Sequence, residues 1–101
     1  MISERDLNSL YFYRVNDDSM KGARIRKGST VIVNKQGEVN SGEVALVAFE
    51  GGAIIRRVYQ HEGQAILKSE NPKYPPLALK GRANILGKVI ECRTPIECLI
   101  D

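Results

Sequence analysis

Short apolar segments with strand-like alternation, separated by turn residues, fill almost the whole chain. They are rich in β-branched and aromatic residues, which favour β-strands. No window of eleven or more residues holds a helical stripe, and the best helical candidate is a single turn near 20–26. The sequence therefore predicts an all-β domain. The expected strands are 10–15, 30–34, 43–49, 52–60, 64–69, 76–80, 85–93 and 96–100.

The length of 101 residues fits one domain, which we expect to span 1–101 with a flexible N-terminal segment over 1–9. A chain of this size buries roughly 60–68% of its unfolded surface around one small core. Hydrophobic residues make up 43% and charged residues 27%, which is typical of a globular chain. Segment 1–9 has no apolar run, and no stretch approaches about 18 apolar residues. We therefore expect a cytoplasmic protein without a signal peptide or a membrane span.

The net charge of +3 comes from 15 basic and 12 acidic residues scattered along the chain. The densest basic cluster contains Lys21, Arg24, Arg26 and Lys27. Phosphate-binding domains usually show a stronger basic bias and a recognisable motif, and none of the common ones is present. A solvated basic face is therefore favoured over direct binding of nucleic acid, which stays open as a lower-ranked alternative.

The cysteines and the histidine do not follow a metal-binding pattern. Cys92 and Cys98 lie six residues apart and could face each other across a turn at Thr94 and Pro95, but a cytoplasmic chain favours two reduced, half-buried thiols. His61 is the single histidine, and its spacing from the cysteines does not match a structural zinc site. We expect no metal and no cofactor.

Two apolar strands meet at the sequence EGG, residues 50–52, whose glycines can supply the positive φ of a tight hairpin turn. Alternation along 53–59 places Arg56 between the apolar side chains of Ile54 and Val58 on one face. Such a position is unusual for a solvated arginine, although an edge strand would let the side chain reach water. The pattern leaves both arrangements open.

Six blocks along the chain have the order found in a known family. They are VNDDSM (15–20), KGSTVIV (27–33), NSGEVALV (40–47), AIIRRVY (53–59), SENPKYPPL (69–77) and ILGKVIECR (85–93). The blocks resemble those of the C-terminal domain of LexA, the UmuD proteins and phage repressors, which cleave their own chain with a serine–lysine dyad. The resemblance covers about residues 10–93 and implies several coiled β-sheets that include a small barrel-like core.

The resemblance places Ser19 at the position of the nucleophile. A serine hydroxyl attacks a carbonyl only if a neighbouring group takes its proton, and a lysine can do so when burial lowers its pKa. No histidine is required for this chemistry. By the same resemblance, the backbone N–H groups of Asp18 and Ser19 are the expected oxyanion donors.

The family's lysine position is occupied by Arg56, 37 residues after Ser19. A guanidinium has a pKa above about 12 and cannot be deprotonated inside a protein, so it cannot act as a general base. No other lysine has the right position: Lys68 belongs to the next strand, and Lys21 and Lys27 flank the turn after the serine. The sequence therefore predicts the outline of a serine–lysine site that has lost its base.

A second departure is Asp17, where the family usually has glycine. A carboxylate near the nucleophile would repel a developing oxyanion. Our hypothesis is that Arg56 reaches Asp17 or Asp18 and forms a charge-assisted ion pair in place of the lysine–serine contact. The alternative is that Asp17 faces solvent in a turn.

Several functions are compatible with these features. The first is a non-catalytic regulatory module of a repressor, which would dimerise through a C-terminal strand that includes Ile96, Cys98 and Ile100. The second is an active self-cleaving peptidase of the LexA/UmuD type, and a UmuD-like accessory protein of the DNA-damage response is a further alternative. A signal-peptidase-like enzyme ranks lower because no membrane anchor is present.

The resemblance also predicts partners and missing parts. Family members carry a cleavable segment, often with an Ala-Gly bond, upstream of the first strand, and no Ala-Gly pair occurs here. DNA would be contacted only through a helix-turn-helix domain absent from this chain, and a RecA-type filament is a candidate partner. Pro72, Pro75 and Pro76, with Tyr74, are expected to fix an extended crossover between strands rather than to bind peptides.

Overall fold

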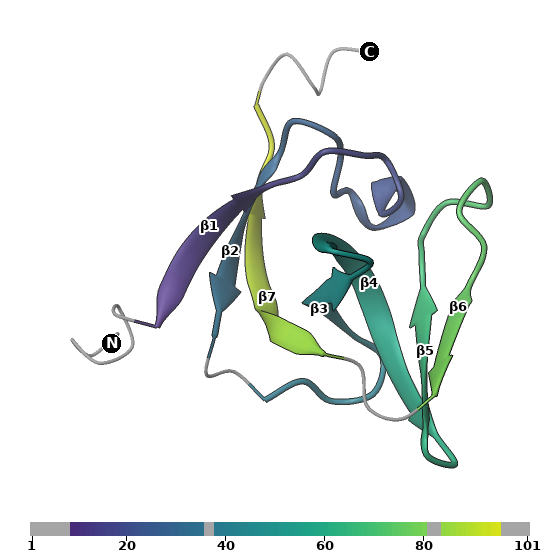
Figure 1. Ribbon diagram of the computed structural model, residues 1–101. Helices are drawn as coiled ribbons and strands as arrows, with labels where there is room; N and C mark the ends of the chain where they lie inside the picture. Colours follow the sequence, from purple (N-terminus) through teal and green to yellow (C-terminus); the bar gives the residue numbers. More distant parts are fainter. Residues whose placement is uncertain (1–8, 36–37, 81–83, 96–101) are drawn as a thin grey trace.

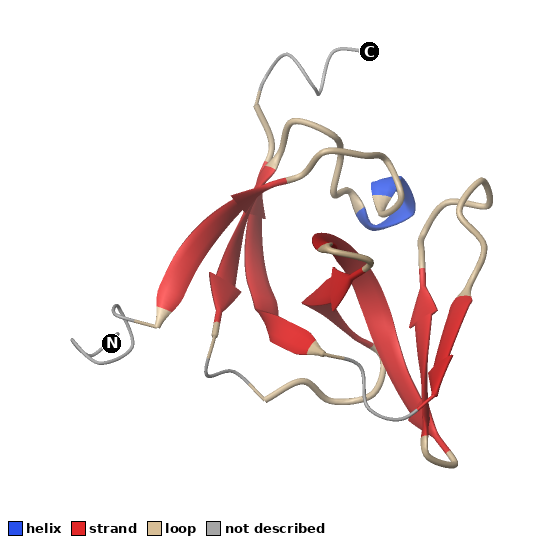
Figure 2. Ribbon diagram, viewed as in Figure 1, coloured by secondary structure: helices blue, strands red, loops and turns tan. Residues whose placement is uncertain are grey.

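A computed structural model describes residues 9–35, 38–80 and 84–95. These residues form seven β-strands and one short 3-10 helix, η1, which is the one helical turn in Figure 2. The elements are β1 (Leu10–Arg14), η1 (Lys21–Ala23), β2 (Thr30–Asn34), β3 (Glu43–Phe49), β4 (Gly52–His61), β5 (Gln64–Lys68), β6 (Leu77–Lys80) and β7 (Ile85–Arg93).

The seven strands form one antiparallel sheet in the order β1-β2-β7-β3-β4-β5-β6. The last strand, β7, thus lies between β2 and β3, and the sheet coils around the core (Figure 1). The all-β class is confirmed, but one continuous sheet replaces the several sheets that we expected. Within the described chain it stays open, with β1 and β6 as its edges.

The two faces of the sheet supply two core clusters. Leu46 of β3 packs in the first cluster, while its neighbours Ala45 and Val47 point to the other face and pack in the second. This division follows from the alternation of side chains along a strand. The first cluster contains Val15, Met20, Ile25, Val31, Val33, Leu46 and Ile55, and the second contains Ala45, Val47, Val58, Ala65 and Leu67.

The observed strands agree with seven of the eight expected segments to within one residue at each end, and η1 lies in the expected helical turn. The eighth segment, 96–100, lies outside the described residues. No helix in the described ranges is long and apolar enough to cross a membrane.

The structure rules out one alternative that was left open and one local expectation. β4 is not an edge strand, because it pairs with β3 on one side and β5 on the other. The segment 69–76 is not a crossover, because β5 and β6 are antiparallel neighbours and the segment is the loop of a hairpin. The prolines therefore shape a long hairpin loop, and this loop becomes important for the site.

Two hairpins close with two-residue turns in which both central residues have positive φ. In the β3–β4 turn φ is 49° at Glu50 and 80° at Gly51, and in the β4–β5 turn it is 48° at Glu62 and 76° at Gly63. Positive φ at both positions defines the type I′ turn, which matches the twist of antiparallel strands. The glycines thus occupy only the second central position of each turn. The glutamate at the first central position has a strained left-handed conformation.

We predict that Glu50→Asn and Glu62→Asn each stabilise the domain by about 0.5–1 kcal/mol, because asparagine tolerates the left-handed region better than glutamate. Urea unfolding would measure the free energies. Gln60→Asn is the matched control, since residue 60 is an exposed position in β4. No gain at the turns, or an equal gain at residue 60, would contradict this explanation.

Candidate functional site

The segment after β1 forms a tight turn that carries Ser19. Val15 and Met20 anchor its two ends, because both side chains are buried in the first core cluster. The backbone N–H of Lys21 donates to the carbonyl oxygen of Asp18 at 3.1 Å and closes the turn. Ser19 is only 1% exposed, so its hydroxyl faces the interior.

Both carboxylates of this turn accept hydrogen bonds from backbone N–H groups. Oδ1 of Asp17 accepts from the N–H of Ser19 at 2.9 Å, and Oδ1 of Asp18 accepts from the N–H of Lys27 at 3.0 Å. Short acidic side chains commonly bind the N–H two residues further on and so stabilise a turn. As a result, the N–H of Ser19, which we expected to be an oxyanion donor, is already bound to the carboxylate of Asp17.

The β5–β6 loop packs against the Ser19 turn and holds it in place. The N–H of Glu70 donates to the carbonyl oxygen of Ser19 at 2.8 Å, and the N–H of Gly22 donates to the carbonyl oxygen of Glu70 at 2.8 Å. Nδ2 of Asn71 donates to the carbonyl oxygen of Asp18 at 2.9 Å. Figure 1 shows η1 and this loop side by side. Segments about 50 residues apart in the sequence thus build one site.

Arg57 ties the same loop to β4. Its Nε donates to Oε1 of Glu70 at 2.6 Å, and one of its terminal nitrogens, Nη1, donates to the carbonyl oxygen of Gly42 at 2.9 Å. A partly exposed ion pair alone contributes little stability, but this one is charge-assisted and short. Arg57 therefore has a structural role, which the alternation pattern could not assign.

Arg56 reaches the serine from the neighbouring position of β4. Nη1 of Arg56 donates to Oγ of Ser19 at 2.6 Å and to the carbonyl oxygen of Ile55 at 2.8 Å. The arginine is only 6% exposed, and its Nε is buried without a hydrogen-bond partner. The structure thus brings together the two residues that the resemblance assigns to the catalytic pair.

The environment of Arg56 acts on its pKa in opposing directions. Burial lowers the pKa from its ordinary value, because desolvation disfavours the charged form, whereas Asp17 and Tyr74 raise it. The guanidinium carbon lies 5.6 Å from the centroid of the Tyr74 ring, within range of a cation–π contact. A guanidinium starts from so high a pKa that it stays charged near neutral pH.

The expected ion pair is not formed as a direct contact. Over residues 9–35, 38–80 and 84–95, no ion pair within 4.0 Å joins Arg56 to a carboxylate. Asp17 and Asp18 instead bind N–H groups, and Arg56 donates to the serine hydroxyl. The alternative was that Asp17 faces solvent in a turn; Asp17 does lie in a turn, where it is half-buried and accepts a hydrogen bond from the N–H of Ser19. Asp17 acts on Arg56 through its charge, not through contact.

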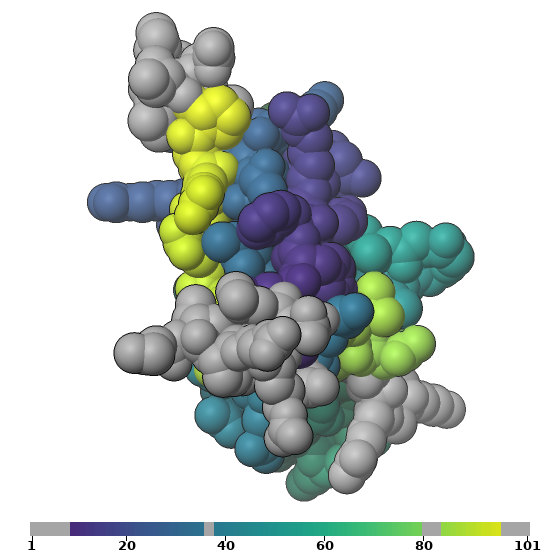
Figure 3. All heavy atoms as spheres, turned by 90° about the vertical axis from the view of Figure 1, so that its left-hand side faces the viewer, coloured from purple at the N-terminus to yellow at the C-terminus, as the bar shows by residue number. Residues whose placement is uncertain are grey.

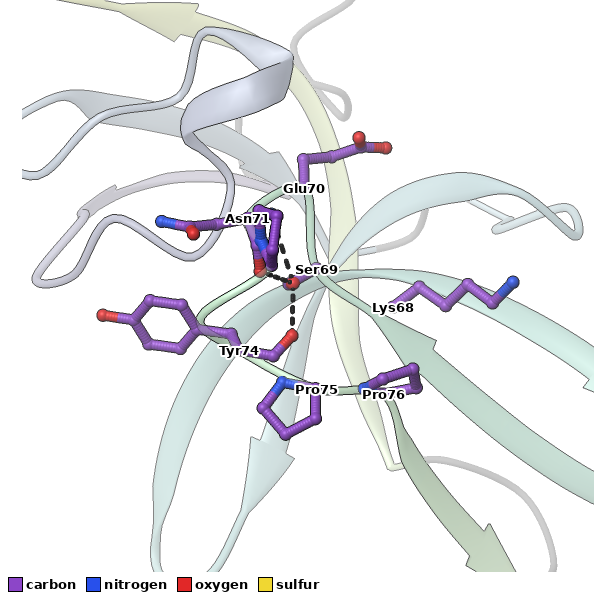
Figure 4. Close-up of a pocket in the computed structure, with 8 residues that line it drawn as sticks. Lys68, Ser69, Glu70, Asn71, Tyr74, Pro75 and Pro76 are labelled. Carbon is purple, nitrogen blue, oxygen red and sulfur yellow. Dashed lines mark hydrogen bonds between the residues drawn. The ribbon is translucent and has the colours of Figure 1, made fainter.

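A cavity of about 440 Å³ lies in the β5–β6 loop beside the serine turn. Oγ of Ser69 lies 2.8 Å from the carbonyl oxygen of Asn71 and 2.6 Å from that of Tyr74, and this hydroxyl holds the loop closed (Figure 4). The side chains of Asn71 and Tyr74 point to one side of the loop and that of Lys68 to the other (Figure 4). The cavity is lined by Lys68, Ser69, Glu70, Asn71, Pro72, Tyr74, Pro75 and Pro76.

Sequence reasoning missed the roles of Glu70, Asn71 and Arg57 in holding the turn. A signal was present at Asn71, because asparagine before proline favours a turn in which the side chain binds a later N–H. The structure shows this bond, from the N–H of Lys73 to Oδ1 of Asn71 at 3.0 Å. Nothing in the sequence indicated that the loop would also contact residue 18.

The remaining predicted residues lie away from the serine. Cys92 is a free, half-buried thiol, with its sulfur 3.9 Å from Oγ1 of Thr94. Ile96, Cys98 and Ile100, the expected dimer strand, lie outside the described residues, so this expectation stays a prediction.

The described all-β domain thus places a buried serine, which follows its first strand, against a basic side chain from a hairpin strand, an arrangement that resembles the site of a serine-peptidase-like domain. The comparisons with known proteins specify the family. The model of the Peptidase S24-like family matches residues 2–90, so the chain belongs to this family.

The chain is similar to several LexA repressors. It is 36% identical to that of Lactobacillus johnsonii over 88 residues, which cover 86% of this chain and 42% of the relative. Over 81 residues it is 33% identical to the LexA repressor of Leptospira interrogans serovar copenhageni, covering 80% of this chain and 39% of the relative. The chain thus spans about two fifths of the length of the curated relatives it matches.

We predict that Gly22→Ala destabilises the domain by about 1–3 kcal/mol, because the added Cβ would lie 2.5 Å from the carbonyl oxygen of Glu70 and push the loop off the turn. Gly52→Ala is the control, since a Cβ there would meet its nearest atom at 3.9 Å. Thermal unfolding of both variants would measure the effect. Equal stabilities would show that the close contact is unimportant.

A second prediction concerns the serine as a hydrogen-bond acceptor. Ser19→Ala should cost about 1–2 kcal/mol, because the buried charge of Arg56 loses an acceptor. In an Arg56→Met background the same substitution should cost much less, and a double-mutant cycle would give the coupling energy. Ser41→Ala, at an exposed position, controls for the loss of a hydroxyl. A coupling near zero would contradict this role.

Proposed function

We propose that this chain is the regulatory domain of a LexA-like repressor that has lost the ability to cleave itself. The observation that carries the proposal is the hydrogen bond of 2.6 Å from Nη1 of Arg56 to Oγ of Ser19. In a serine–lysine dyad the basic side chain must accept the serine proton. Here the contact runs in the opposite direction, because a charged guanidinium can only donate.

The missing base is the first of two chemical obstacles. Deprotonating an arginine near neutral pH is far too costly, even when burial lowers its pKa. In the described part of the chain, Arg56 is the only side chain that hydrogen-bonds to Oγ of Ser19. Lys68 cannot replace it, because its side chain is exposed and its Nζ lies 5.3 Å from the centroid of the Tyr59 ring.

The second obstacle is the state of the oxyanion donors. The N–H of Ser19 donates to the carboxylate of Asp17, so it is not free for a developing oxyanion. The negative charge of that carboxylate would also repel an oxyanion formed beside it. Losing a single oxyanion donor typically lowers the rate by a factor of about 10²–10³, and here the negative charge of Asp17 would also repel the oxyanion.

A non-cleaving domain of this kind still has a physical task in a repressor. The relatives are named LexA repressors, and this chain corresponds to about two fifths of their length. We propose that a helix-turn-helix domain outside this chain contacts DNA in the cytoplasm. The domain formed by this chain would then pair two copies of the repressor, so that their DNA-binding domains lie at the spacing of operator half-sites. A RecA-type filament would then not release the repressor through self-cleavage, so relief of repression must use another route.

The test is covalent labelling of Ser19 by a fluorophosphonate at neutral and alkaline pH, with Ser19→Ala as the blank. We expect no labelling of the unmodified chain, since Arg56 cannot act as a base and the N–H of Ser19 is already bound to the carboxylate of Asp17. Labelling of Ser19, or alkaline cleavage of a supplied linker peptide, would instead support an active LexA/UmuD-type peptidase and overturn the proposal.

The two obstacles are separable by substitution. We predict that Arg56→Lys alone gives weak labelling, Asp17→Gly alone gives none, and the double variant labels at least tenfold faster than Arg56→Lys. The reason is that the lysine supplies the base and the glycine releases the N–H of Ser19. If Arg56→Lys labels as fast as the double variant, Asp17 is not an obstacle.

A further inference from the structure

Within the described residues, β1 presents an unpaired edge at one end of the sheet. The N–H of Val15 donates to the carbonyl oxygen of Ser29, and the N–H of Lys35 donates to that of Ser9, which fixes the hydrogen-bonding register with β2. Odd-numbered residues of β1 therefore bond to β2, and the N–H and C=O groups of Leu10, Phe12 and Arg14 point away from it. In the described ranges no strand pairs with this edge.

The same edge exposes a large aromatic side chain. Phe12 is 69% exposed, more than any other large apolar residue in the described chain. It lies over an apolar groove of about 360 Å³ whose floor includes Ile32 of β2, the residue opposite Phe12 in the register. Figure 3 faces this side of the molecule and shows the atoms of β1 as a purple strip beside those of β2. An open edge with an exposed aromatic residue favours pairing with another strand.

We propose that β1 pairs with β1 of a second copy, antiparallel and around a two-fold axis at Phe12. The three central residues of β1, YFY, read the same in both directions, with Tyr11 and Tyr13 on either side of Phe12. The axis therefore places Phe12 opposite Phe12 and each Tyr11 opposite Tyr13 of the other copy. Aromatic cross-strand pairs stabilise a sheet, and a two-fold interface requires such self-complementarity.

Backbone geometry and charge are compatible with this register. The groups of Phe12 point outward, so the central pair would exchange two hydrogen bonds, as would the two pairs that join Leu10 to Arg14. An axis at Arg14 would instead place two cations directly opposite each other, which is destabilising. The axis at Phe12 uses all five residues and keeps the two arginines at opposite ends.

This interface is separate from the dimerisation that we predict through residues 96–100, and it goes beyond the proposed function. A protomer with two distinct two-fold interfaces assembles into a closed tetramer or an open chain, not only a dimer. A single five-residue edge is smaller than a standard interface of about 1,600 Å². We therefore expect weak association that depends on protein concentration.

A charge-exchange experiment tests the two-fold axis. Sedimentation equilibrium of the full chain would compare the unmodified protein, Phe12→Lys, Phe12→Glu and an equimolar mixture of both variants. Each variant alone should associate at least tenfold more weakly, because like charges face each other, and the mixture should regain the association. Leu86→Lys, at another exposed apolar position, should change nothing.

Disulfide formation gives a second measurement in a Cys92→Ser, Cys98→Ser background. The Cα atoms of a hydrogen-bonded antiparallel pair lie about 5.5 Å apart, which suits a disulfide. Phe12→Cys should therefore cross-link two copies under mild oxidation. Leu10→Cys alone should not, since it would face Arg14.

The outcomes separate this interface from the proposed repressor function. Association that ignores charge at residue 12 would overturn the β1 pairing while leaving dimerisation through the C-terminal strand intact. A chain that stays monomeric at millimolar concentration, or equal cross-linking of the Phe12→Cys and Leu10→Cys variants, would overturn it as well. Fluorophosphonate labelling does not depend on any of these results.

Discussion

The buried charge of Arg56 is the constraint on which the site depends. Moving a cation out of water costs several kcal/mol, and the domain has no carboxylate in direct contact to offset this cost in the described chain. Compensation comes from the oxygen atoms of Ser19 and Ile55, the ring of Tyr74 and the more distant charge of Asp17. The serine turn and the β5–β6 loop must both stay in place for this arrangement to persist.

Under the proposed function, the serine has a different physical role from that of a nucleophile. A nucleophilic hydroxyl needs a partner that removes its proton, whereas a hydroxyl beside a guanidinium is needed for its lone pairs. The loss of the base would therefore not make Ser19 dispensable, because removing it would leave a buried donor without an acceptor. The carboxylate of Asp17 accepts the N–H of Ser19, a bond that stabilises the turn. Under the proposed function, the geometry of a catalytic pair would thus be kept as a structural contact.

The sequence predicted the strands well because their alternation and their turn residues are local signals. It also indicated that Arg56 and Ser19 would meet, since the resemblance preserved their separation of 37 residues. It did not predict that Asp17 would bind the N–H of Ser19, because a short carboxylate can bind either a nearby N–H or a distant cation, and the sequence is compatible with both. Nor could it predict the contact of Asn71 with Asp18, which depends on how two distant loops pack. Local sequence patterns therefore specify the strands and turns. Which of several possible partners a polar side chain binds depends on the packing of the complete fold.

The position of β7 has a consequence for how the chain acquires its structure. The strand is the last one described, yet it lies between β2 and β3 and joins the β1–β2 hairpin to the β3–β6 part of the sheet. During synthesis these two parts emerge first, and neither can complete its hydrogen-bond ladder before residues 85–93 have left the ribosome. Pairings between such distant segments are slow to form, because long loops must close first. The growing chain therefore exposes the edges of β2 and β3 until β7 is available.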